Sequence, residues 1–113
     1  MHEFSIMEST LTLASEQARL ASATRVFVLR MRVGALSSAV PEALQLAFEA
    51  LSPGSPLEGA ELVIESVPAR FFCENCRQEF VSDRMISECP GCQQPSRDIR
   101  GGRELELVSI EVE

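Results

Sequence analysis

The sequence predicts an α/β (α+β) fold: a small mixed three-stranded sheet with two helices, plus an inserted four-cysteine, ribbon-like subdomain. Three observations support this fold class. Apolar residues recur at helical spacing in two segments and alternate in three others. Two Cys-x-x-C pairs stand between the second and third alternating segments. With 113 residues and 45% hydrophobic residues, the chain has the length and composition of one folded domain.

The first helix is expected to begin near residue 5. Residues 5–8 are Ser-Ile-Met-Glu, which has the spacing of a capping box. Apolar residues then follow at steps of four and three, which places them on one helical face. These residues are Met7, Leu11, Ala14, Ala18 and Ala21.

A half-buried strand is expected at residues 25–33, where apolar side chains alternate with arginines. The apolar set is Phe27, Leu29, Met31 and Val33, with Arg30 and Arg32 on the other face. Pro41 suits the first turn of a second helix, and Pro53 and Gly54 end it.

Residues 61–67 are expected to form the second strand, and the order strand, helix, strand predicts a parallel pair. Residues 104–113 form the third, where the apolar alternation slips at Val108; a bulge, or burial of both faces, would explain the slip. The predicted division is an α/β domain at residues 1–67, completed by strand 103–113, and a metal-binding subdomain at residues 68–102.

The cysteine segment carries the strongest chemical signal. Cys73-Glu-Asn-Cys76 and Cys89-Pro-Gly-Cys92 supply four thiolates, which suit the tetrahedral preference of Zn²⁺. Four protein ligands make a closed, structural zinc site, and a segment this short needs the metal in order to fold. Two disulfides, a redox dithiol and an iron centre are the alternatives. The residues expected to pack around the site are Phe71, Phe72, Phe80, Val81 and Ile86.

Charge and targeting signals narrow the function. The formal net charge is -7, which disfavours a nucleic-acid backbone as partner, and the segment 68–103 has only six arginines against five acids. We see no signal-peptide pattern and no apolar run of about 20 residues, so we expect a cytoplasmic protein without a membrane partner. No triad or phosphate loop is present, so we expect no catalytic residues. A zinc-ribbon nucleic-acid or protein interaction module is the alternative function.

The N-terminus carries the only histidine. Met1-His2-Glu3 offers an imidazole, a terminal amine and backbone amides within a few bonds. Nitrogen-rich sets of this kind suit Ni(II) or Cu(II). Glu3 has a second interpretation, as a negative charge that offsets the dipole of the first helix.

Together these motifs resemble the HypA/HybF family of hydrogenase nickel insertion proteins over the whole chain. The motifs are Met1-His2-Glu3, Val33-Gly34-x-Leu36-Ser37, Pro41-Glu42-Ala43-Leu44, Ala47-Phe48-Glu49 and the cysteine pattern. The resemblance implies a nickel metallochaperone for the maturation of [NiFe]-hydrogenase, or of urease in some organisms. It implies Ni²⁺ carried by His2 and Glu3, and structural Zn²⁺ held by the cysteines.

The resemblance also implies partners: a nickel-handling maturation GTPase and the large subunit of [NiFe]-hydrogenase. The protein is expected to be a monomer or a homodimer. Two positions depart from the family pattern. Ala35 stands where members carry an acidic residue, and Val40 stands where many carry a carboxylate before the proline. Glu42 is the candidate to replace that carboxylate.

Overall fold

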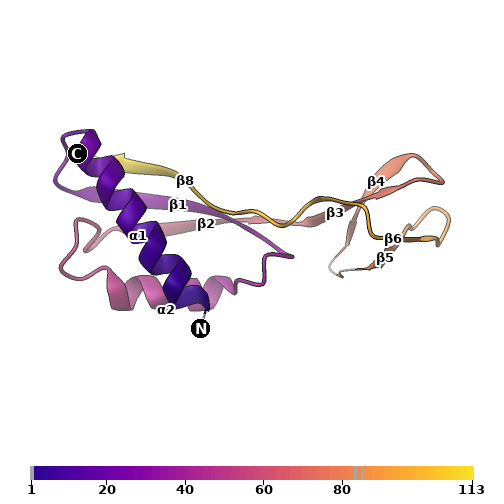
Figure 1. Cartoon of the computed structure of the whole chain (residues 1–113), viewed down its shortest axis with the longest axis horizontal. Helices are drawn as coiled ribbons and strands as arrows, with labels where there is room; N and C mark the ends of the chain where they lie inside the picture. The colour runs from indigo at the N-terminus through magenta and orange to yellow at the C-terminus, as the bar shows by residue number, and fades with distance from the viewer. Residues whose placement is uncertain (1, 83, 85) are drawn as a thin grey trace.

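The computed structural model describes residues 2–82, 84 and 86–113. The molecule is elongated, with extents of 54 × 27 × 16 Å. Both helices lie at one end, beside the main sheet, and the cysteine module lies at the other (Figure 1). None of the helices described is long and apolar enough to cross a membrane.

The α/β part contains the main sheet, in the order β2-β1-β8. β1 pairs in parallel with β2 and antiparallel with β8, which confirms the predicted mixed sheet. The connection from β1 through α2 to β2 is the predicted crossover. The elements are α1 (His2–Leu20), β1 (Val26–Gly34), α2 (Pro41–Leu51), β2 (Glu61–Val67) and β8 (Leu105–Val112).

One hydrophobic core joins the helices to β1 and β2. On α1 the buried residues follow the predicted helical spacing: Met7, Leu11, Ala14 and Ala18. On β1, Arg30 and Arg32 face away from this core and pair with glutamates of the neighbouring strands. The β1 side chains that face the core are Val26, Leu29, Met31 and Val33. The sheet is therefore covered by helices on one face and carries a row of ion pairs on the other.

Two details of the strands differ from the simple alternation. Phe27 was expected in the core but is 49% exposed, because the pairing of β1 with β8 shifts register between Val26 and Val28. A second shift separates the pairs Arg30–Ser109 and Met31–Leu107. The side chain of Val108 is exposed there, so of the two explanations for the slipped alternation the bulge is correct.

The cysteine module lies between β2 and β8 in the chain and forms two small sheets of its own, β4-β3-β7 and β5-β6. Only Pro68 separates β2 from β3, so the long strand runs from one part into the other. That the two parts fold as separate units stays a prediction. The elements are β3 (Ala69–Cys73), β4 (Gln78–Ser82), β5 (Ser87–Glu88), β6 (Pro95–Ser96) and β7 (Ile99–Gly101).

The loop between β1 and α2 touches the segment that returns from the module. Gly34 N–H donates to the carbonyl oxygen of Glu104 at 2.6 Å, and Leu36 N–H donates to that of Gly102 at 2.7 Å. Ala35 N–H donates to Val67 at 2.9 Å. These bonds fix the start of the loop that leads to the N-terminus of α2.

Candidate metal sites

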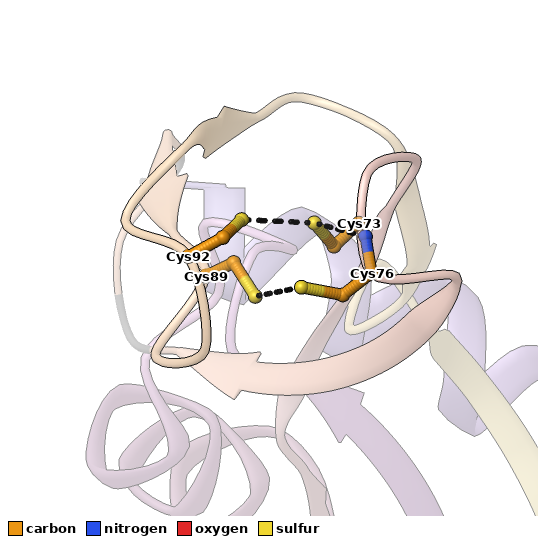
Figure 2. A group of neighbouring side chains, drawn as sticks. All are labelled: Cys73, Cys76, Cys89 and Cys92. Carbon is orange, nitrogen blue, oxygen red and sulfur yellow. Dashed lines mark hydrogen bonds between the residues drawn. The ribbon is translucent and has the colours of Figure 1, made fainter.

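Two turns of similar design bring the four predicted cysteines together. Cys73 ends β3 and Cys89 directly follows β5, and each begins a tight turn that carries the second cysteine of its pair. Cys76 N–H donates to Cys73 Sγ at 3.3 Å, and Gly91 N–H donates to Cys89 Sγ at 3.4 Å. Figure 2 shows the side chains of both pairs pointing toward one central point. The backbone thus supplies donors that favour thiolates there.

The spacing of the sulfur atoms fits a tetrahedral metal. A tetrahedron with Zn–S bonds of about 2.3 Å has S···S edges of about 3.8 Å. Here Cys73 Sγ lies 3.6 Å from Cys92 Sγ, and Cys89 Sγ lies 3.9 Å from Cys76 Sγ. All four sulfurs lie within 4.8 Å of one another. The arrangement can hold one metal ion and leaves no open position for a reacting water.

The thiols of the site differ in acidity. Hydrogen bonds from the Asn75 side chain and the Gln94 backbone lower the pKa of Cys92. The pKa of Cys76 is raised, first by its hydrogen bond with Cys92 and then by burial. A divalent ion must therefore displace protons when it enters, and its affinity falls in acid. Sequence reasoning missed Asn75 and Gln94 as contributors, because neither is itself a ligand.

Aromatic packing supports the site in part as expected. The buried ring of Phe71 stacks on Phe80 with centroids 5.7 Å apart, and the guanidinium of Arg100 lies 4.2 Å from the centroid of Phe72. Val81 and Ile86 do not pack there; they are 63% and 49% exposed. Val81 on β4 and Ile86 in the loop before β5 have outward-facing side chains, because a module this small has only one buried side.

The N-terminal segment is already helical. His2 and Glu3 occupy the first turn of α1, so the capping-box prediction of a start near Ser5 was wrong. Glu3 explains the earlier start, because its negative charge lies in the first turn and offsets the helix dipole. The terminal amine of Met1, a predicted candidate ligand, lies outside the described residues.

Glu3 also reaches the second helix. Its Oε2 accepts a hydrogen bond of 3.1 Å from the backbone N–H of Val40, the N-cap residue of α2. Its own backbone N–H and that of Val40 lower the pKa of the Glu3 carboxyl. The side chain of His2, the residue before Glu3, is exposed. The structure thus brings the predicted His2–Glu3 pair to the start of α2, whereas the cysteines lie at the far end of the molecule (Figure 1).

Comparisons with known proteins agree with this architecture. A family model described as "Hydrogenase/urease nickel incorporation, metallochaperone, hypA" matches residues 1–112. A hydrogenase maturation factor HypA of Picosynechococcus sp. is 44% identical over 112 residues, which is 99% of each chain. One from Chloroflexus aurantiacus is 42% identical and covers 98% of each chain.

Solved structures share the fold. The solution structure of the Ni metallochaperone HypA from Helicobacter pylori has a TM-score of 0.65 at 23% identity, over 97% of this chain and 96% of that one. Another structure, titled "Solution structure of HypA protein", has a TM-score of 0.68 at 25% identity, over 99% and 96%. With a family model and curated relatives that span essentially the whole chain, this protein belongs to the HypA family of nickel incorporation metallochaperones.

Proposed function

We propose that this protein carries Ni(II) at its N-terminus and delivers it for the maturation of [NiFe]-hydrogenase. The observation that supports this most is the match of residues 1–112 to the nickel incorporation family, in a chain that begins Met1-His2-Glu3. Urease is a second possible recipient, since the family description names both enzymes. A cytoplasmic location belongs to the same proposal.

Nickel is the cargo, and nitrogen atoms of the first helical turn hold it. The proposed ligands are the His2 imidazole and the backbone nitrogens of His2 and Glu3. The first four N–H groups of any α-helix lack an intrahelical acceptor. Ionising the amides of His2 and Glu3 therefore breaks no i→i−4 bond of the helix, and the one bond given up is that of the Glu3 N–H to its own carboxylate. Deprotonated amides with an imidazole form the nitrogen-rich set that suits square-planar nickel.

Zinc has the separate role of holding the cysteine module together. Four thiolates at tetrahedral spacing suit Zn²⁺, and they leave no coordination position for water or a substrate. The ion supplies the stability that the short strands of the module cannot. Because the site has no open position, we assign it no catalytic step, and the protein acts as a carrier.

The proposed partners are a nickel-handling GTPase and the hydrogenase large subunit. The rival function, a zinc ribbon that binds nucleic acid, has weaker support. Arg70 and Arg100 of the module already pair with Glu79 and Asp98, and the whole chain carries a net charge of -7. Tagged at the C-terminus, the protein should recover the GTPase from a hydrogenase-producing cell; recovery of nucleic acid without the GTPase would favour the rival.

Complementation tests delivery itself. In a cell that lacks its own nickel incorporation chaperone, the parent protein should restore nickel to the purified hydrogenase large subunit, and His2→Ala should not. Equal zinc content in the two proteins shows that the variant is folded. Full restoration by His2→Ala, or none by the parent, would contradict the proposal.

A further inference from the structure

The loop that joins β1 to α2 is tied down at both ends. At its start, Leu36 N–H donates to Gly102. In its middle, Ala39 N–H donates to Ser37 Oγ at 3.3 Å. At its end, Val40 N–H donates to Glu3 Oε2 at 3.1 Å. This last bond joins the loop to α1.

The start of α2 has an unusual need for such a partner. Its N-cap is Val40, a residue with no side-chain acceptor, whereas most N-caps are Ser, Thr, Asp or Asn. Pro41 follows at the first helical position and has no N–H. The carboxylate of Glu3 thus meets the N-terminal ends of two helices, and both dipoles favour its negative charge. The Val40 side chain is 48% exposed, so it adds little apolar packing of its own to this corner.

From this geometry we propose that the Glu3 carboxylate is a positioning group, a clasp that fixes the nickel-binding turn of α1 to the start of α2 and does not itself bind the metal. The nickel part of this inference rests on the proposed function. In this arrangement the backbone nitrogen of Glu3 would bind the metal, while its side chain accepts the hydrogen bond from Val40 N–H. The two roles of Glu3, as metal ligand and as helix partner, are thereby divided between its backbone and its side chain.

The clasp limits the freedom of the turn that carries His2. His2 is the residue next to Glu3, and its side chain is exposed with the start of the chain beyond it. The rest of α1 and the bond from Val40 to Glu3 both restrain this turn. The restraint keeps the imidazole and the two amides close together, which lowers the entropy lost when they bind one ion. Releasing the clasp frees that turn without disturbing the core, which begins at Met7.

Four single variants and the double variant Glu3→Ala with Val40→Pro, each in the full chain, test the clasp. Glu3→Ala removes the acceptor, and Val40→Pro removes the donor while leaving the carboxylate in place. Val40→Ala keeps the N–H and is the matched control. Glu3→Gln keeps an oxygen acceptor but is a poorer metal ligand. The readout is the rate at which preloaded nickel passes to an excess of chelator, with zinc content and circular dichroism as checks on folding.

If Glu3 acts as a clasp, Glu3→Ala and Val40→Pro each speed nickel release about five-fold, as for the loss of one ordinary hydrogen bond. The double variant releases nickel no faster than either single variant, since both changes break the same contact. Glu3→Gln speeds nickel release less than Glu3→Ala does. The nickel absorption spectrum keeps its shape in all variants. Val40→Ala behaves as the parent does.

A direct ligand role gives the opposite pattern and would overturn the inference. Glu3→Gln would then match Glu3→Ala, both spectra would change, and Val40→Pro would match Val40→Ala. Amide hydrogen exchange in the metal-free protein decides the clasp without nickel: Glu3→Ala should speed exchange at Val40 N–H about five-fold. No change there means that the clasp is absent. A parent that binds no nickel would overturn the proposed function instead, and the exchange result still stands.

Discussion

At the scale of single residues, Gly34 shows how closely the two parts of the chain approach. A Cβ built on Gly34 would lie 2.1 Å from the carbonyl oxygen of Gly102 and 2.8 Å from the backbone nitrogen of Glu104. Both neighbours are backbone atoms, so neither can rotate away. The sequence indicated only that a glycine ends the strand; its tight contact depends on a segment that returns from residue 102.

Gly34→Ala should therefore destabilise the fold far more than an alanine placed at a glycine with free space around it. Overpacking at Gly34 should lower the free energy of unfolding by about 3 kcal/mol or more. Gly54→Ala is the control, because its φ is +84° and nothing lies within 4 Å of its added Cβ. That variant should lose only about 1 kcal/mol, from backbone strain. Urea denaturation of the three proteins checks this, and equal losses would show that contact at Gly34 is unimportant.

Residue chemistry was predictable where it is local in sequence. The metal site of the four cysteines could be predicted from their spacing, because residue type and short-range spacing identify metal ligands. The bond from Val40 to Glu3 could not be predicted, since it joins positions 37 residues apart and is made by a backbone group that carries no sequence signature. The prediction that Phe27 is buried was wrong for a related reason. A bulge in the pairing of β1 with β8, a strand distant in sequence, turns the Phe27 side chain away from the core.

At the scale of elements, periodicity predicted what each segment becomes, whereas tertiary contacts set where it begins. β2 spans residues 61–67 as expected, and α2 begins at Pro41 as expected, because proline and glycine mark these boundaries locally. The start of α1 was placed too late, because a contact with α2 supports the turn before Ser5. The strands of the cysteine module are as short as two residues, below the length at which alternation can be recognised.

The short strands of the module predict that its folding depends on the metal. Cys73→Ala should lower zinc content to near zero and abolish amide protection across β3 to β7, because metal binding supplies roughly 10 kcal/mol or more to such sites. Protection in α1, α2 and β1 should largely remain, since their core cluster contains no residue of the module. Native exchange measured by NMR, with chelator-treated parent as a second metal-free sample, checks this. A variant that keeps both zinc and a protected module would show that the cysteines do not organise it.

At the scale of the whole molecule, the fold separates the two proposed metal sites. The four-cysteine site lies at one end, and the start of α1 lies in the α/β part at the other (Figure 1). The topology was predictable because the crossover in a strand, helix, strand unit is nearly always right-handed. The last strand was expected to complete the same sheet, as β8 does. The elongated shape was not, since it follows from β2 continuing into β3 across a single proline.

Metal analysis of the untagged protein tests the central claim most directly, with parent and His2→Ala measured before and after addition of Ni(II) and removal of the unbound ion. We expect about one zinc per chain in both proteins throughout, held by the closed cysteine site. We expect the parent to gain about one nickel per chain and His2→Ala to gain none, because His2 is the only imidazole in the sequence. Nickel bound to His2→Ala as fully and as tightly as to the parent would contradict the N-terminal site and direct attention to the cysteines.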